Sequence, residues 1–149
     1  MSRSSSAASA PHSSAEAAEA AFYEALQAGD TDAVMRVWAE DDEPVCVHPG
    51  GPRLVGAAAI RASYEQLLGG GSLALAPECV LRTVTMGCAV HNVVERARLP
   101  AGAGAGFACV LATNVYLRTP QGWRLVLHHA SPGTLDDAGE LLAQADRLH

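Results

Sequence analysis

The spacing of apolar residues changes halfway along the chain. Up to Leu68, apolar side chains recur every three or four positions, which is typical of amphipathic helices. From Leu73 onward they alternate with polar side chains, and this period of two is typical of strands with one buried face. The pattern therefore predicts helices first and a sheet second.

Three helices are predicted in the first half. The first begins at the capping-box pattern Ser13–Glu16 and ends at Gly29, and the second opens at Asp30 or Thr31, both favourable N-caps. The third runs from about Ala57 to Leu68 and ends at three consecutive glycines. The side chains expected to face inward are Ala18, Phe22, Ala25, Leu26, Val34, Val37, Trp38, Ile60, Tyr64, Leu67 and Leu68.

Five strands are predicted. Val45–His48 forms a short one, followed by the turn Pro49–Pro52. Four longer strands come after the third helix, joined by Met86–Gly87, by a Gly/Ala-rich loop and by the turn Pro120–Gly122, and connections this short make strands antiparallel neighbours. The longer strands are Leu73–Thr85, Cys88–Leu99, Phe107–Thr119 and Trp123–Ala130.

Three helices followed by a curved antiparallel sheet predict an α+β fold with the helices on one face of the sheet. A bent sheet wrapped around helices forms a conical barrel with an open mouth, a place that favours ligand sites. We expect this domain to span residues 15–131. A flexible Ser/Ala-rich tail, 1–14, precedes it, and an extension with a weak helical pattern, 132–149, follows.

Composition narrows the range of partners. Of the 149 residues 17% are charged, the net charge is −6, and the basic residues are arginines scattered singly, so no nucleic-acid partner is expected. No apolar run approaches the roughly 18–20 residues that cross a bilayer, so no membrane partner is expected. The four cysteines lack the spacing of zinc or redox motifs and are predicted to be reduced apolar residues, which indicates a cytoplasmic protein.

Polar side chains stand inside otherwise apolar strands near the end of the chain. Asn114, His128 and His129 need partners there, since a buried polar group without one costs roughly 1–3 kcal/mol. Strand alternation puts the two adjacent histidines on opposite faces but leaves open which one points inward. The simplest arrangement turns Asn114, Tyr116 and His128 into the concave side, where Glu95 joins them.

Two interpretations of this group stay open. In the first, Glu95 and His128 are catalytic proton-transfer partners, while Asn114 and Tyr116 orient a carbonyl or hydroxyl group. In the second, the same groups satisfy one another and the site is inert. The ligand-binding set predicted around them is Trp38, His48, Tyr64, Asn114, Tyr116 and His129.

His48 has two alternative roles as well. It either points into the mouth of the cone beside Trp38 and Tyr64, or fixes the turn that follows it by hydrogen bonding. No metal is predicted, because His128 and His129 point to opposite faces and can hardly chelate one ion. No cofactor is predicted either, and the remaining histidines, His12, His91 and His149, are given no role.

The outer face of the last two strands is expected to be apolar. A monomer would expose its side chains as one large patch. We therefore expect a homodimer in which a second subunit covers the outer face of the sheet. The row consists of Val115, Leu117, Trp123, Leu125 and Leu127.

Several short motifs, in their order and spacing from roughly Ala15 to Ser131, resemble the SnoaL-like proteins of the nuclear transport factor 2-like superfamily. The motifs are Phe22-Tyr23-x-Ala25-Leu26-x-x-Gly29-Asp30 with Val37-Trp38, then Gly56-x-x-x-Ile60, then Gly122-Trp123-Arg124-Leu-Val-Leu-His128-His129-Ala-Ser131. The last strand and Cys46-Val47-His48-Pro49 are also similar to the association (hub) domain of calcium/calmodulin-dependent protein kinase.

The resemblance implies the conical fold and leaves the activity open, because this fold hosts cyclases, isomerases, dehydratases, binding proteins and dimerisation modules. Where the hub domain places pocket arginines, the chain has Glu95, Asn114 and Ala130, so an anion-binding pocket is not implied. Three functions are considered, in this order. They are a small-molecule-binding domain with an apolar pocket and a polar cluster, a cofactor-independent isomerase, cyclase or dehydratase using His128 and Glu95, and a dimerisation or regulatory module with a vestigial pocket.

Overall fold

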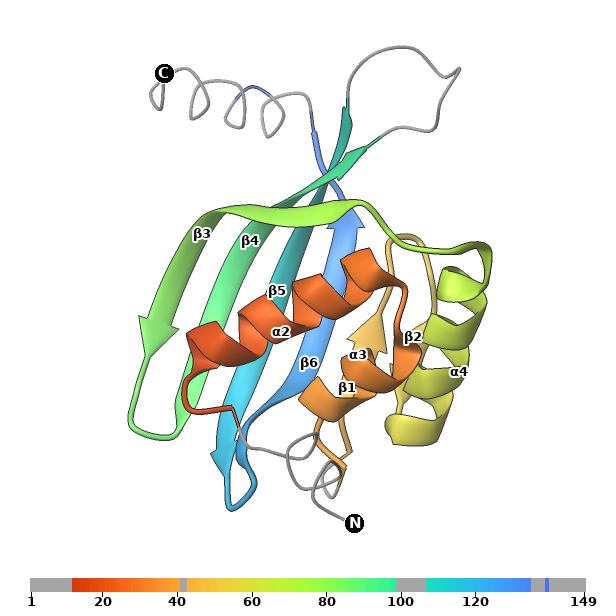
Figure 1. Ribbon diagram of the computed structural model, residues 1–149. Helices are drawn as coiled ribbons and strands as arrows, with labels where there is room; N and C mark the ends of the chain where they lie inside the picture. The colour runs from red at the N-terminus through yellow and green to blue at the C-terminus, as the bar shows by residue number, and fades with distance from the viewer. Residues whose placement is uncertain (1–11, 41–42, 99–106, 135–138, 140–149) are drawn as a thin grey trace.

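The computed structural model describes residues 12–40, 43–98, 107–134 and 139 (Figure 1). The predicted elements are confirmed to within a few residues, and one short strand, β2, was not predicted. The weak helix expected between Leu135 and Leu148 and most of the N-terminal tail lie outside the described residues. The elements are α2 (Ala15–Ala28), α3 (Thr31–Val37), β1 (Val45–Val47), β2 (Arg53–Val55), α4 (Ala57–Leu67), the single turn η1 (Leu68–Gly70), β3 (Leu75–Val84), β4 (Cys88–Arg98), β5 (Phe107–Thr119) and β6 (Gly122–Pro132).

The six strands form one curved sheet in the order β2-β1-β6-β5-β4-β3. The predicted antiparallel pairing holds from β3 to β6, but β1 runs parallel to β6, so the sheet is mixed. The three helices lie on the same side of the sheet, with α2 stretched across it and α4 at the β2 end (Figure 1). The core therefore fills the concave side, and none of the helices in the described ranges covers the outer face.

The first helix begins one residue later than the capping-box pattern indicates. Ser14, not Ser13, is the N-cap, and its hydroxyl accepts a hydrogen bond from the backbone N–H of Ala17 at 3.0 Å. At the other end, Gly29 adopts the left-handed conformation (φ 70°) that a C-cap requires. These caps set the length of the helix that spans the sheet.

Leu67 does not face inward as predicted. It is 41% exposed, whereas Leu68 is buried in the core. The α-helix ends between the two residues, and the tighter turn that follows turns only Leu68 toward the sheet.

A β-bulge in the last strand changes which residues face inward. Val115 pairs with Leu127, but the next residue of β5, Tyr116, pairs with Leu125, so Val126 is an extra residue. An extra residue reverses strand alternation beyond it. Leu125 and His128 are therefore both buried on the concave side, and Trp123, two residues before Leu125, packs against the same core. The prediction that Leu125 and Trp123 belong to the outer row is wrong.

In the described ranges, none of the helices combines the length and the apolar character needed to cross a membrane.

Candidate functional site

A row of polar side chains crosses the concave face at a single level of the sheet. In the strand register His91 of β4 is opposite Asn114 of β5, Asn114 is opposite His128 of β6, and His128 is opposite Cys46 of β1. Directly opposed side chains lie close enough to interact. The register of four strands therefore gathers residues that are far apart in the sequence.

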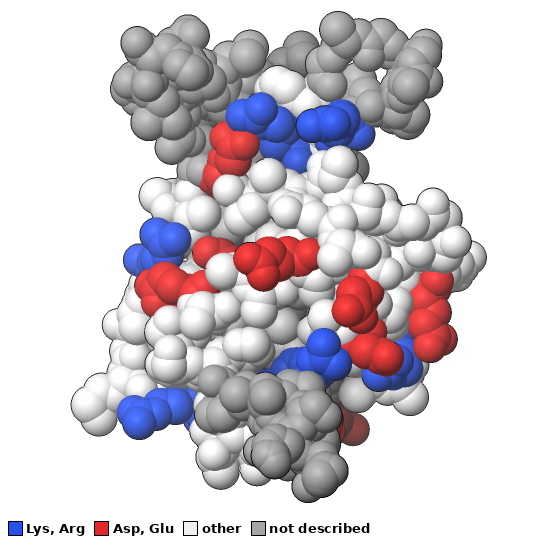
Figure 2. Space-filling model, in the orientation of Figure 1, with Lys and Arg blue, Asp and Glu red and all other residues white. Residues whose placement is uncertain are grey.

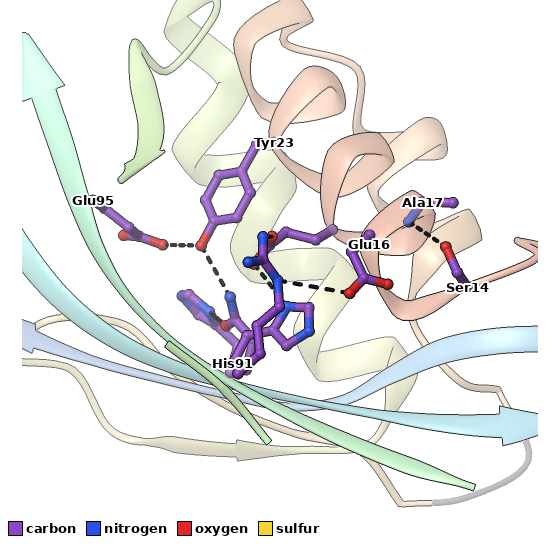
Figure 3. Close-up of polar contacts among 10 residues, drawn as sticks. Ser14, Glu16, Ala17, Tyr23, His91 and Glu95 are labelled. Atoms are coloured by element: carbon purple, nitrogen blue, oxygen red, sulfur yellow. Dashed lines mark hydrogen bonds and ion pairs between the residues drawn. The ribbon is translucent and has the colours of Figure 1, made fainter. Parts of the chain in front are cut away.

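Four buried side chains form a continuous hydrogen-bonded chain, which we call the polar chain. Tyr23 of α2 lies 2.6 Å from Glu95 Oε2 through its hydroxyl, and Asn114 Nδ2 lies 3.0 Å from the same hydroxyl. Asn114 Oδ1 lies 2.5 Å from Nδ1 of His128. Figure 3 shows Tyr23 reaching from the helix down to Glu95 on the sheet.

One assignment of hydrogens satisfies every link of the polar chain. The Tyr23 hydroxyl donates to Glu95, the Asn114 amide donates to the tyrosine oxygen, and His128 Nδ1–H donates to the amide oxygen. His128 is then neutral, with its lone pair on Nε2. Glu95 Oε1 and His128 Nε2 are the two ends of the chain.

Burial shifts the two titratable ends of the polar chain in opposite directions. Glu95 is 2% exposed, and desolvation raises the pKa of its carboxyl to about 7, although the Tyr23 hydrogen bond opposes the rise. Desolvation, with the neighbouring His48 and His129, lowers the pKa of His128 to about 3. At neutral pH the carboxyl is therefore poised between its two forms, while the imidazole stays neutral.

Aromatic rings surround the His128 end. The ring centroids of Phe22 and His128 are 5.5 Å apart, and Tyr64 stacks edge-on against Phe22 at 6.3 Å. The His48 ring lies 5.1 Å from Tyr64, and its Nε2 lies 3.0 Å from the hydroxyl of Ser63 on α4. Of its two predicted roles, the structure therefore favours contact with the aromatic group, because the His48 side chain bonds the helix and not the turn.

A second buried polar group lies one helical turn away, on the same face of α2. His91 Nδ1 is 3.0 Å from Glu19 Oε2, and Arg82 lies 3.7 Å from both Glu19 and Glu16. His91 is fully buried, although the sequence analysis gave it no role. Figure 3 shows His91 at the sheet, on the side that faces the helix carrying Glu16 and Tyr23.

Two of the cavities on the described part of the molecule lie away from the polar chain. One, of about 850 Å³, lies between α2, α3 and the β5–β6 turn. The other, of about 510 Å³, lies between the end of α2 and the β3–β4 pair. Neither is lined by a predicted site residue.

The structure brings most of the predicted site residues together. Glu95, Asn114, Tyr116 and His128 are buried on the concave side, and Trp38 and Tyr64 belong to the same core. His129 is exposed and, adjacent to His128 in an extended strand, points to the other face, so it does not join the group.

Two buried polar residues of α2, Tyr23 and Glu19, were not predicted from the sequence to belong to the site. They lie one turn apart on the buried face of the helix, the face that also carries Ala15 and Leu26. Helical spacing alone could have placed them inward, as polar residues on an otherwise apolar face. In the described segments, no three His, Cys, Asp or Glu side chains cluster as a metal site requires.

Comparisons with known proteins agree with this architecture. Residues 15–134 match the family model described as the SnoaL-like domain. A search of curated proteins gave no match.

Three solved structures are similar to the chain. A candidate calcium/calmodulin-dependent protein kinase type II association domain from Thiobacillus denitrificans is 38% identical, with a TM-score of 0.75 over 83% of this chain and 98% of that one. A candidate dehydratase of the nuclear transport factor 2-like family from Streptomyces avermitilis is 32% identical, with a TM-score of 0.67 over 78% of this chain and 91% of that one.

The third, a nuclear transport factor 2-like protein of unknown function from Pseudomonas putida, is 18% identical and shows the shared fold alone, with a TM-score of 0.69 over 78% of this chain and 82% of that one. With the family model matched over most of its length and the curved sheet covered by three helices, the chain belongs to the SnoaL-like domain family of the nuclear transport factor 2-like superfamily.

Proposed function

We propose that the chain is a small-molecule-binding domain whose ligand is held by the polar chain. The observation that carries this proposal is that four polar side chains, supplied by α2, β4, β5 and β6, meet in the core among aromatic rings. Removing such groups from water costs free energy, and an apolar core would avoid that cost. Few polar groups placed precisely within an apolar interior are typical of ligand sites.

The two ends of the polar chain define the ligand's chemistry. His128 Nε2 is an acceptor for a hydroxyl or amide donor, and Glu95 Oε1 accepts from a donor or, when protonated, donates to a carbonyl. The surrounding rings of Phe22 and Tyr64 favour an apolar body. We therefore propose an apolar molecule with a hydroxyl or carbonyl group.

We propose that binding is accompanied by a side-chain rearrangement, since neither of the two cavities described above reaches the polar chain. Phe22 packs against the His128 ring and Tyr64 packs against Phe22, so we propose that these two rings rotate to admit the ligand. Rotamer changes of this kind are common at binding sites whose backbone stays fixed.

The adjacent histidines provide a matched test of the binding site. We expect native mass spectrometry to detect a copurifying small molecule, and His128→Ala to weaken its binding about tenfold, the equivalent of one lost hydrogen bond. His129→Ala, on the exposed face, should leave binding unchanged. Equal effects of the two substitutions would contradict the proposed site, as would the absence of any adduct together with no thermal shift across a panel of apolar alcohols and ketones.

A second candidate function is proton transfer in a cofactor-independent isomerase, cyclase or dehydratase. The specific observation in its favour is the pKa of about 7 at Glu95, since a general acid or base works best near the ambient pH. The 32% identity to a candidate dehydratase adds support. Glu95 would then move the proton, and His128, neutral at this pH, would hold the substrate by a hydrogen bond. Incubating the copurified molecule with the protein distinguishes the two candidates. A ligand is recovered unchanged, whereas a substrate is recovered as its product.

We also propose a homodimer through the outer face of the sheet. No helix in the described ranges covers that face, and Val115, Leu117 and Leu127 remain partly exposed on it. The relative named as an association domain supports the same idea. This arrangement would place a second copy of the chain opposite β5 and β6.

Light scattering tests the dimer. The wild-type chain is expected to elute at twice its own mass, and Val115→Arg to elute as a monomer, because a charge at the centre of an apolar interface is not paired there. Met86→Arg, in the exposed β3–β4 turn, is the control and should remain dimeric. A wild-type chain at monomer mass would disprove the proposal.

Two further proposals concern partners and location. Basic groups stand near the two ends of the molecule with acidic groups between them on the face that Figure 2 shows, which supports the proposal that nucleic acid is not a partner. Cys46 and Cys88 carry thiols and not disulfides, which supports a reducing compartment such as the cytoplasm.

A further inference from the structure

His91 is positioned by a carboxylate on one side and lacks a partner on the other. Its Nδ1 is 3.0 Å from Glu19 Oε2, and the guanidinium of Arg82 lies 3.7 Å from the other oxygen of Glu19. With Glu19 as the acceptor, Nδ1 carries a ring hydrogen, and Nε2 of the neutral ring presents a lone pair. That Nε2 atom is fully buried and has no hydrogen-bond partner in the part of the chain that the structure describes.

A second buried polar atom without a close hydrogen-bond partner belongs to the residue beside it. The hydroxyl of Tyr116 is buried and makes no close hydrogen bond with a described residue, although the Asn114 side chain lies near enough to interact with it. The register pairs Tyr116 with Ala89 and His91 with Asn114, so Tyr116 and His91 are diagonal neighbours on the concave side of β4 and β5. Their ring centroids are 5.1 Å apart. Two such atoms would each cost roughly 1–3 kcal/mol if nothing satisfied them.

A third polar group is close by. Asn114 stands directly opposite His91 and two residues before Tyr116. One of its two amide N–H groups donates to the Tyr23 hydroxyl, which leaves the other for a second acceptor. Burial raises the pKa of Tyr116 well above its ordinary value, as do Glu19 and Glu95, and the nearby Asn114 amide opposes that rise. The place between His91 and Tyr116 is therefore within reach of a third hydrogen-bonding group, and buried waters typically have about three.

We infer that His91 Nε2 and the Tyr116 hydroxyl together bind one buried water molecule. The ligand is water and not a larger molecule, because both residues are fully buried and neither cavity is lined by them. This water accepts from the tyrosine hydroxyl and donates to the imidazole nitrogen. The site does not depend on the proposed ligand-binding function, since its atoms belong to the neighbouring pair.

The water connects the two buried polar groups. On one side it meets His91 and Glu19, which continue to Arg82 near the surface. On the other it stands beside Asn114, the middle of the polar chain. A single line of polar groups then runs from the partly exposed guanidinium to Glu95 and His128.

Crystal structures of the full chain and of Tyr116→Phe test the water site. We expect the wild-type density to show one water within about 2.6–3.2 Å of both atoms. Tyr116→Phe should lose this water, whereas Tyr64→Phe should keep it, since the Tyr64 hydroxyl has Cys46 as its neighbour at 3.8 Å. In solution, a nuclear Overhauser effect from water to the His91 ring should vanish in Tyr116→Phe alone.

Unfolding in urea gives an independent result. If the water is bound, Tyr116→Phe removes one of its hydrogen bonds, and the variant should unfold at a lower urea concentration than the wild type. Without the water, the substitution removes an unsatisfied hydroxyl, and the variant should be as stable as the wild type or more so. That second result, or wild-type density with nothing between the two atoms, would overturn the inference. If Tyr116→Phe does not fold, the wild-type density and the wild-type water signal decide.

Discussion

Glu95→Gln is expected to stabilise the protein at about pH 8 by about 3 kcal/mol and to have little effect at about pH 5. The ionised carboxylate is buried, and burial raises its pKa to about 7 from the ordinary 4.5. A raised carboxyl pKa means that the folded state binds the proton more tightly than the unfolded state. The resulting stabilisation is fully present below pH 4.5 and is lost as the pH rises through 7. An uncharged amide avoids that loss.

The measurement is the difference in unfolding free energy between Glu95→Gln and the wild type across this pH range. His128 makes stability change with pH in the opposite direction, and it does so equally in both proteins, so its contribution cancels in the difference. Its pKa is lowered to about 3, so its stabilisation is present above its ordinary pKa of 6.5 and is lost as the pH falls. A difference that does not change with pH would show that Glu95 titrates normally and would remove the basis for its role as an acid or base.

A gain in stability on removing Glu95 would itself bear on function. Natural proteins retain a costly buried charge where activity needs it, and such sites become more stable when the charged group is replaced. The prediction thus separates a retained functional group from a merely structural one. A structural carboxylate, paired only to hold Tyr23, would destabilise the protein on replacement at every pH.

Phe22→Ala is expected to lower the free energy of unfolding by about 3–5 kcal/mol. The ring is fully buried where α2 crosses the sheet, with centroids 5.0 Å from Tyr23 and 5.5 Å from His128. Its removal leaves a cavity between α2 and the curved sheet that the surrounding side chains can fill only in part. Urea unfolding, monitored by circular dichroism, measures the loss.

Phe107→Ala is the matched control, since it removes the same ring from a half-buried position at the end of β5. That ring contacts the Arg96 guanidinium at 5.2 Å, so the expected loss is about 1 kcal/mol. Equal losses at the two positions would contradict the conclusion that the core is centred beneath α2. Phe22→Ala also tests the closed interior, because the space it opens beside His128 should admit an apolar ligand more readily.

Local patterns in the sequence determined the elements and most of the polar chain. Helical spacing placed Phe22 and Tyr64 inward, and period two placed Asn114 and Tyr116 on one face of β5, because both periodicities depend only on backbone geometry. Which of His128 and His129 faces inward could be decided only from the structure. The bulge at Val126 lies between Leu125 and His128, and its position depends on pairing with another strand.

Only the tertiary structure decided which side chains meet. Tyr23 contacts Glu95 across 72 positions of sequence, and Glu19 contacts His91 across the same separation. Both contacts follow from the single orientation in which α2 packs across the sheet. Contacts of this kind depend on how a helix docks, and no local pattern encodes docking. The sequence alone established that a curved sheet would carry inward polar groups. The packing of one helix decided that they are paired, buried and shifted in pKa, because hydrogen bonds and desolvation act between elements and not within them.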